Sequence, residues 1–338
     1  MRTHSSGKAS KRTKPEGGLC ETMQDPQDLS KGDFGQIIYP SASPFEIHHI
    51  LCKMDKAVEH PVFGSLLVPE KPSKGPMPCV IAAHGSLNWR GHHHEHMVRW
   101  LDAGICVFRV HSFDSRSVYS VVEDQMQVTH AMMLADCYQA LRMLSTHPSI
   151  DERRIGIAGW SLGGTVALYS AWEPIAESLA PAGERFAAHL PFYPAAHMRT
   201  EVQRWSDKPI LALHGSADDW VPLKLLEGLV DDLSPHGVDL RVHVYDEAPH
   251  SFDSIEPLDF DPRAIRLDDH RTVTIDSDGS MWGEIEPGVI MPLNEPSDRL
   301  AAFQAIGNLG VHKGVDWEAR RHSLELAAEF LEESLCGQ

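Results

Sequence analysis

The sequence has few basic residues for its acidic content. Among 338 residues, 30 are Lys or Arg and 48 are Asp or Glu, so the formal net charge is −18. This balance opposes binding to nucleic acid or to anionic membranes. The chain also lacks any run approaching the about 18 apolar residues of a membrane-spanning helix, and its basic amino terminus has no signal-peptide apolar core. We therefore expect a cytoplasmic protein with neither a nucleic-acid nor a membrane partner.

Cysteine is scarce as well, with six residues in the whole chain. Cys79 and Cys106 fall in apolar strand-like runs and Cys137 on a helical segment, where a free cysteine behaves as a small buried hydrophobe. No two cysteines have metal-site spacing. Histidines cluster in residues 91–96, but the H-E-x-x-H order is absent. We interpret that cluster as the solvated start of a helix, and we expect no metal and no cofactor.

Strand-like and helix-like segments alternate from about residue 79 to residue 245, which predicts one doubly wound α/β sheet. Residues 1–32 are poor in large apolar side chains and are predicted to be a disordered arm. Residues 33–338 form the predicted single domain. Within it, residues 36–39, 45–50 and 62–68 are predicted antiparallel edge strands, and residues 123–146 a core helix.

An insertion of approximately residues 255–314 precedes the last helix. Residues 271–275 and 280–285 flank a turn and predict a hairpin. Ser297 is placed to cap a short helix over 298–306, and Asp316 to cap the closing helix. The insertion is expected either to overhang the active site and shape its specificity or to be a surface decoration.

The most informative motif surrounds Ser161. Residues 154–158 form a short apolar run, residues 159–164 read Gly-Trp-Ser-Leu-Gly-Gly, and a helix-like stretch follows. A strand, a sharp turn and a helix with serine at the apex are typical of a nucleophile, because the tight turn needs glycine at the positions packed against it. The alternative is a serine that only caps a helix.

A serine nucleophile needs a base and an acid, expected downstream in the order Ser, Asp, His. Asp218 follows the apolar strand 209–214, and His250 follows the strand 240–245. Loops at the carboxyl edge of a parallel sheet converge on one crevice, so these groups can meet Ser161 there. Asp219 remains an alternative acid, whereas His243 lies within a strand and is a poorer base.

The developing oxyanion requires two backbone donors. One is expected from Leu162, the residue after the nucleophile. The other is expected from Ser86, because strand 79–83 leads into His84-Gly85-Ser86 and Gly85 allows close approach of the backbone. An ordinary exit from a strand is the alternative interpretation of that loop.

Together these segments resemble the dienelactone hydrolase family of the α/β-hydrolase superfamily. The likeness rests on His84-Gly85, residues 159–164, residues 214–222 and residues 248–253. It implies an α/β-hydrolase fold: a mostly parallel, doubly wound sheet with helices on both faces. The founding enzymes use a nucleophilic cysteine and place a glutamate where Gly85 stands and an arginine where Ser254 stands. This chain resembles a serine-nucleophile member instead.

The resemblance implies hydrolysis of a small ester or lactone through an acyl-enzyme, with Ser161, Asp218 and His250 as triad. It also suggests Arg116, in a segment like a family loop, and Trp160 as candidate substrate-binding residues; an exposed surface arginine is the alternative for Arg116. An acyltransferase or a small peptidase could use the same triad. A ligand-binding homologue without turnover is a further alternative.

Overall fold

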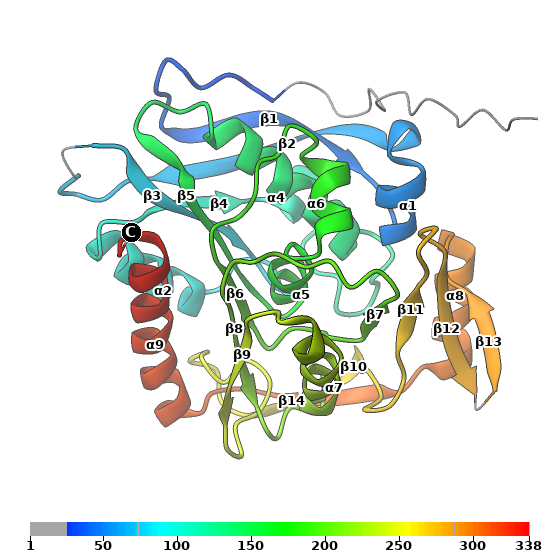
Figure 1. Ribbon diagram of the computed structural model, residues 1–338. Helices are drawn as coiled ribbons and strands as arrows, with labels where there is room; N and C mark the ends of the chain where they lie inside the picture. Colours follow the sequence, from blue (N-terminus) through cyan, green and yellow to red (C-terminus); the bar gives the residue numbers. More distant parts are fainter. Residues whose placement is uncertain (1–25, 73–74, 287, 338) are drawn as a thin grey trace, which may run out of the picture.

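The structure is a computed structural model that describes residues 26–72, 75–286 and 288–337 (Figure 1). Most of the predicted disordered arm, residues 1–25, lies outside the described residues. The last part of that arm is packed, because Leu29 is fully buried and its backbone N–H donates to Thr146 Oγ1 at 2.8 Å. The packed chain therefore begins before residue 33.

An eight-stranded sheet with the order β1-β2-β4-β3-β5-β6-β8-β9 forms the centre of the protein. Strands β1 and β2 are antiparallel, and the pairs from β4–β3 to β8–β9 are parallel. All seven residues of β3 are buried, as expected for a parallel strand covered on both faces. The strands are β1 (Gly35–Ser43), β2 (Val58–Leu67), β3 (Met77–Ala83), β4 (Cys106–Val110), β5 (Ile150–Trp160), β6 (His189–Phe192), β8 (Ile210–Gly215) and β9 (Leu240–Tyr245).

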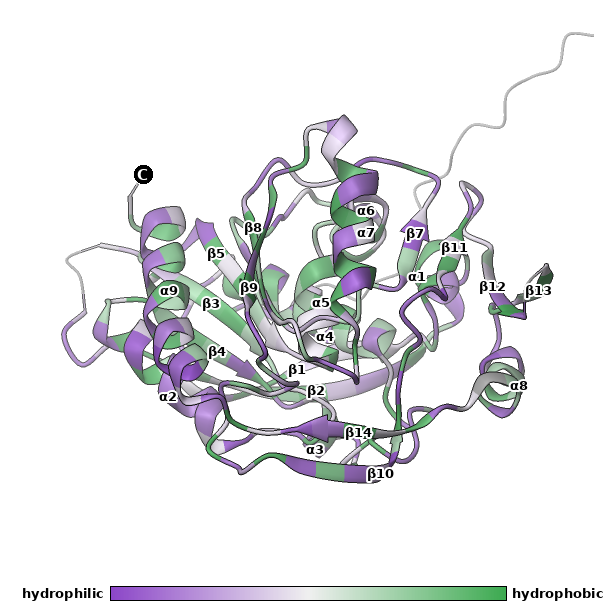
Figure 2. Cartoon of the chain, turned by 90° about the horizontal axis from the view of Figure 1, so that it is seen from below, coloured by the Kyte–Doolittle hydropathy of each residue, from purple (hydrophilic) through white to green (hydrophobic). Residues whose placement is uncertain are grey.

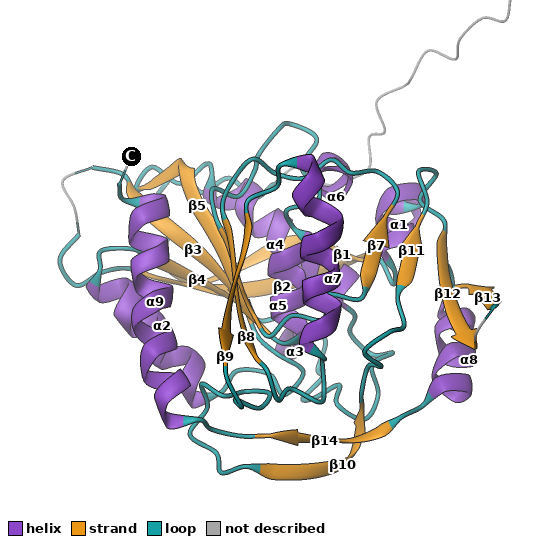
Figure 3. Ribbon diagram, turned by 60° about the horizontal axis from the view of Figure 1, so that its bottom comes forward, coloured by secondary structure: helices purple, strands orange, loops and turns teal. Residues whose placement is uncertain are grey.

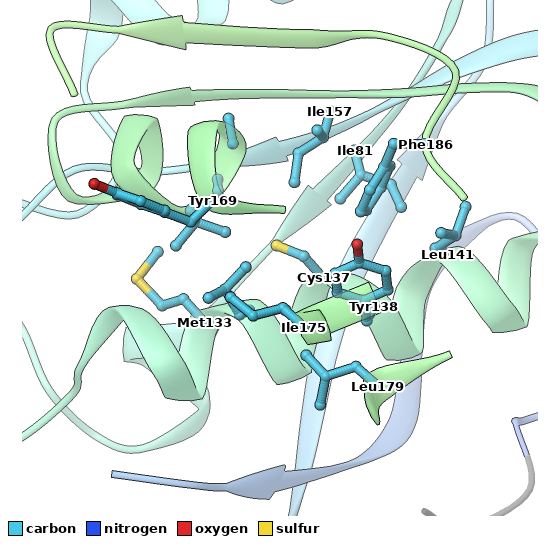
Figure 4. Packing of buried hydrophobic residues seen from close by; sticks show 14 of the residues in the cluster. Ile81, Met133, Cys137, Tyr138, Leu141, Ile157, Tyr169, Ile175, Leu179 and Phe186 are labelled. Atoms are coloured by element: carbon cyan, nitrogen blue, oxygen red, sulfur yellow. The ribbon is translucent and has the colours of Figure 1, made fainter. Parts of the chain in front are cut away.

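Helices cover both faces of this sheet, which confirms the predicted α/β-hydrolase architecture (Figure 3). One face carries α2 (Gly91–Asp102) and α9 (Trp317–Leu335), and the other carries α4 (His130–Leu144), α5 (Leu162–Tyr169), α6 (Glu173–Leu179) and α7 (Leu223–Leu233). Each face has its own apolar core. Figure 4 shows the core under α4, α5 and α6, where Tyr138, Ile157 and Phe186 lie together.

Two predicted elements differ in the structure. Residues 45–50, predicted as a strand, lie largely in α1 (Ile47–Cys52), whose N-cap Glu46 forms a capping box with His49. The helix predicted from residue 123 begins only at His130, where the Thr129 side chain accepts a hydrogen bond from the Met132 amide. Three further helical segments are short: α3 (Ser112–Ser115) and the segments Met54–Lys56 and Ser234–His236.

The insertion adds two small sheets beside the main one. β10 (Asp259–Ile265) and β14 (Leu309–Lys313) pair antiparallel and cross the edge of the main sheet at which β9 ends (Figure 3). Figure 2 shows both hydrophilic and hydrophobic residues in this pair, whereas β3 is largely hydrophobic. The predicted hairpin is confirmed by β11 (Val273–Ile275) and β12 (Met281–Glu286), which pair antiparallel. β12 also pairs with β13 (Val289–Pro292), and β11 pairs in parallel with β7 (Met198–Thr200).

The caps of the last two helices differ in outcome. Helix α8 (Pro296–Ile306) begins after Glu295, which caps it, so the prediction that Ser297 is the cap is wrong. Asp316 caps α9 as predicted, because its side chain accepts from the amides of Glu318 and Ala319. Among the described residues, no helix combines the length and apolar character needed to cross a membrane.

Candidate active site

Ser161 lies at the sharp turn between β5 and α5, with φ 53° and ψ −110°. Such a backbone is strained for a residue with a side chain and is sustained only by close packing around it. A Cβ on Gly159 would lie 2.0 Å from Gly163 O, and one on Gly163 would lie 2.2 Å from Ala83 O. These two glycines are therefore required by the close approach of β3, β5 and α5 at the turn.

The structure brings Ser161, His250 and Asp218 together from three separate strand ends. His250 Nε2 lies 3.0 Å from Ser161 Oγ, and His250 Nδ1 lies 2.6 Å from Asp218 Oδ2. His250 and Asp218 are 1% and 5% exposed, so the hydrogen bond between them is shielded from water, whereas Ser161 is half-buried. The arrangement has the nucleophile–base–acid order that activates a serine hydroxyl.

The second carboxylate oxygen of Asp218 is also hydrogen-bonded. Its Oδ1 accepts hydrogen bonds from the backbone amides of Trp220 at 3.0 Å and Val221 at 2.9 Å. Asp219, the alternative acid, instead accepts from the amide and ring Nδ1 of His312 at 2.8 Å and 2.7 Å. The geometry therefore favours Asp218 over Asp219 as the partner of His250.

His243, the alternative base, does not lie near Ser161. The ring of His243 stacks on His322 of α9, with centroids 4.9 Å apart, on the face of β9 that α9 covers. It makes no contact with Ser161. His250 is consequently the histidine that the fold brings to the serine.

Ser86 and Leu162, the two expected oxyanion donors, both line a cavity that opens at Ser161. Leu162 is the first residue of α5, so its N–H has no partner within the helix. The Ser86 carbonyl accepts from Val121 N at 3.0 Å, which holds the loop after β3 in place. A Cβ on Gly85 would approach Trp160 O to 3.1 Å, so glycine lets this loop lie against the serine turn.

This cavity, called the large cavity from here on, has a volume of about 190 Å³. Its floor is built by the main domain through Thr165, Ala195 and Met198. Much of its wall comes from the insertion, which confirms that this segment overhangs the site. The contributing insertion residues are Ile265, Arg266, Leu267, Asp268, Arg271, Thr272, Val273, Met281, Gly283, Glu284, Ile285, Leu293, Arg299, Ala302 and Phe303.

Arg116 does not line the large cavity, so its position does not support the prediction that it binds substrate. Its guanidinium donates to both carboxylate oxygens of Asp136, at 2.7 Å and 3.0 Å, and also to Ser112 O at 3.1 Å. The Arg116 side chain is 7% exposed and that of Asp136 is fully buried. Arg116 therefore neutralises a carboxylate of α4 inside the core.

Trp160 has a structural role. Its indole is fully buried and donates to Asp253 Oδ2 at 3.0 Å. The same carboxylate accepts from Tyr193 Oη at 2.8 Å and lies 3.2 Å from His96 Nε2. Trp160 also lines a smaller cavity next to Ser161 and His250, so a contact between Trp160 and substrate stays a prediction.

The histidine cluster of α2 is packed against this carboxylate. His92, His93 and His96 are 6%, 3% and 0% exposed, so the prediction of a solvated helix start is wrong for them. Burial would raise the pKa of Asp253, but His92, His96 and the Tyr193 hydroxyl outweigh burial and hold its pKa well below the usual range. Within the described residues, no group of three His, Cys, Asp or Glu side chains is arranged to hold a metal ion.

Sequence reasoning missed one residue that touches both the triad and the cavity. The Trp220 ring packs against His250 with centroids 4.8 Å apart, and its Nε1 donates to Ile265 O at 3.0 Å. Its position two residues after Asp218 was the only available signal. Trp220 thus connects the triad to the insertion.

A model of the dienelactone hydrolase family matches residues 66–273, more than half of the chain. The chain belongs to the dienelactone hydrolase family. It is accordingly a hydrolase of the α/β type, and the matched segment contains the serine turn, Asp218 and His250. The match ends within β11, so β12, β13, α8 and α9 lie beyond it.

Individual relatives are distant. Thermogutta terrifontis esterase 2, phosphoramylated by tabun, has a TM-score of 0.51 at 15% identity, covering 80% of this chain and 89% of that one. A Klebsiella pneumoniae protein assigned as a dienelactone hydrolase has a TM-score of 0.46 at 19% identity, covering 64% and 88%.

One curated relative is a much longer protein. Dipeptidyl peptidase family member 1 of Caenorhabditis elegans is 28% identical over an alignment of 121 residues that covers 31% of this chain and 15% of that protein. The chain therefore matches only a small part of the length of that relative.

Proposed function

We propose that this protein is a serine esterase that cleaves a small carboxylic ester or lactone through an acyl-enzyme. The observation that carries the proposal is the continuous hydrogen-bonded chain from Ser161 Oγ through His250 to Asp218. Family membership supports hydrolysis, and the serine in place of the founding cysteine favours general ester chemistry. Ser254 and Gly85 stand where dienelactone hydrolases carry charged side chains, which disfavours dienelactone itself.

The proposed reaction has two stages, formation and hydrolysis of the acyl-enzyme, and the triad acts in both. Ser161 Oγ attacks the ester carbonyl while its proton moves to His250 Nε2, and Asp218 stabilises the imidazolium through Nδ1. The N–H groups of Leu162 and Ser86 bind the oxyanion. His250 then protonates the departing alcohol as the carbonyl–oxygen bond breaks, and a water activated by the same ring hydrolyses the acyl-enzyme.

A fluorophosphonate probe followed by mass mapping tests the nucleophile. We expect stoichiometric labelling of Ser161 in folded protein and hydrolysis of p-nitrophenyl esters, with both lost in Ser161→Ala. Ser170→Ala is a matched control, since Ser170 lies at the other end of the same helix and is buried. Absence of labelling together with absence of ester turnover in folded protein would identify a binding homologue instead.

Peptide cleavage is the second candidate, favoured by the similarity to the dipeptidyl peptidase family member. Cleavage of a peptide releases an amine, whose nitrogen must be protonated before the C–N bond breaks. Peptide cleavage therefore requires His250 to transfer its proton to that nitrogen. Dipeptidyl p-nitroanilides compared with p-nitrophenyl esters distinguish the two. Preference for the anilides by kcat/KM would replace the esterase proposal, and product partitioning in added alcohols would reveal acyl transfer.

A further inference from the structure

Two cavities meet at Ser161. Besides the large cavity there is a second, called the small cavity, of about 40 Å³. Both are lined by Ser86, Ser161 and Trp220. They differ in the rest of the machinery, because Leu162 lines only the large cavity and His250 lines only the small one.

This difference assigns a side to each half of an ester. When the tetrahedral intermediate breaks down, the departing oxygen takes its proton from His250 Nε2, so the alcohol must lie on the side that His250 faces. The acyl group stays bonded to Ser161 Oγ with its oxygen toward the Leu162 amide, on the side of the large cavity. The small cavity is then the alcohol site and the large cavity the acyl site.

We propose that the enzyme is selective for esters of a one- or two-carbon alcohol with a much larger acid. This inference rests on the esterase activity proposed above. A water-sized group needs roughly 10–15 Å³ of such volume. The small cavity therefore holds about three such groups, enough for methanol or ethanol, whereas the large cavity holds more than a dozen. A benzyl group exceeds the small cavity and fits the large one.

The walls of the small cavity are fixed by packing and hydrogen bonds. Gly314 N donates to His250 O at 2.9 Å, and the Arg90–Glu256 ion pair lies at the outer side. Ser254 is 2% exposed and lines the cavity from the turn after His250. Trp220 lines both cavities and is held by its hydrogen bond to Ile265. The size limit therefore rests on the buried and hydrogen-bonded residues of these walls.

Two series of esters test the assignment in the full-length protein. In the first, the acid is fixed as 4-phenylbutyrate and the alcohol is methyl, ethyl, butyl or benzyl. In the second, the alcohol is methyl and the acid runs from acetate to 4-phenylbutyrate. Each kcat/KM is divided by the rate constant for hydroxide hydrolysis, which removes intrinsic reactivity. We expect at least a tenfold fall from ethyl to benzyl and no fall along the acid series.

Paired variants separate the two sites. Ser254→Gly should raise the benzyl-to-methyl ratio and Ser254→Val should lower it, each by threefold or more, with the acid series unchanged. Ala302→Phe, in the wall of the large cavity, should shorten the accepted acid without changing the alcohol ratio. These ratios do not depend on the fraction of folded enzyme.

Several results would overturn the assignment. Equal or better hydrolysis of the benzyl ester in the wild type, or Ser254 variants that act on the acid series, would place the alcohol in the large cavity. Failure of the esterase proposal is distinguishable, because then Ser161 is not labelled by the fluorophosphonate and no ester in either series is cleaved. Labelled Ser161 with the reversed size preference refutes only the present inference.

Discussion

Folding stability should depend on pH through His189, a buried histidine next to the C-terminal end of α5. It lies on β6 and is 1% exposed. Its Nδ1 donates to Ala167 O of α5 at 3.2 Å and lies 2.9 Å from Ser170 Oγ. Its Nε2 is buried and makes no hydrogen bond to the described residues. Protonation would therefore add an N–H without an acceptor, next to the helix that begins at the serine turn.

The magnitude follows from the pKa of this ring. Burial lowers the pKa of His189 from 6.5 to about 4, partly opposed by the Ala167 carbonyl. Because the folded-state pKa is below the unfolded one, the unfolded chain binds more protons between these values, and stability falls as pH decreases from about 6.5 toward 4. Proton linkage predicts that His189 alone costs about 1 kcal/mol between pH 7.5 and 5.5, and about 3 kcal/mol below pH 4.

Urea unfolding of the wild type and His189→Asn at pH 7.5, 6.5 and 5.5 measures this effect. Asparagine retains an N–H near the place of Nδ1 and cannot be protonated in this range. The variant should be less stable at pH 7.5 because it leaves space in the core. The difference should shrink by about 1 kcal/mol at pH 5.5. The exposed His236→Asn is the control, and a His189 difference independent of pH would refute the reasoning.

Three further predictions follow from named contacts. Asp218→Asn should lower kcat for ester hydrolysis by about 10⁴-fold, because it removes the carboxylate partner of His250. Asp219→Asn should change kcat by less than about threefold, as expected for the exposed pair that Asp219 forms with His312. Ester kinetics of the two variants compare these effects. Gly163→Ala should destabilise folding by about 3 kcal/mol by overpacking, measured by urea; near-wild-type stability would contradict the 2.2 Å approach to Ala83 O. Arg116→Met should lower folding stability by about 3–5 kcal/mol, because it leaves the buried carboxylate of Asp136 unpaired. The kcat/KM of the folded variant should stay unchanged. A loss of kcat/KM without a loss of stability would indicate that Arg116 binds substrate.

The features that sequence reasoning predicted well depend on neighbours in the chain. The serine turn follows from three glycines within six residues, and the hairpin of β11 and β12 follows from alternating residues around a turn. Asp316 caps α9 through amides two and three residues away. The order of Ser161, Asp218 and His250 along parallel strands was sufficient to predict that they meet, because the carboxyl ends of such strands share one edge.

The failures involve groups whose partners are distant in sequence. His92 and His96 look like a solvated helix start until Asp253, more than 150 residues later, is placed beside them. Arg116 looks exposed until Asp136 turns inward from α4. A polar side chain is buried when a partner compensates its desolvation, and local periodicity contains no information about such a partner.

The same argument explains why family membership leaves the substrate open. The family match ends at residue 273, whereas Met281, Glu284, Leu293 and Ala302 of the large-cavity wall lie beyond it. This wall is positioned by the parallel pairing of β7 with β11, which joins Met198 to Val273 across more than seventy residues. Part of the large-cavity wall therefore comes from sequence outside the family match, whereas Ser161, Asp218 and His250 lie within it. The acid that this enzyme accepts can differ from those of its relatives while the serine turn remains the same.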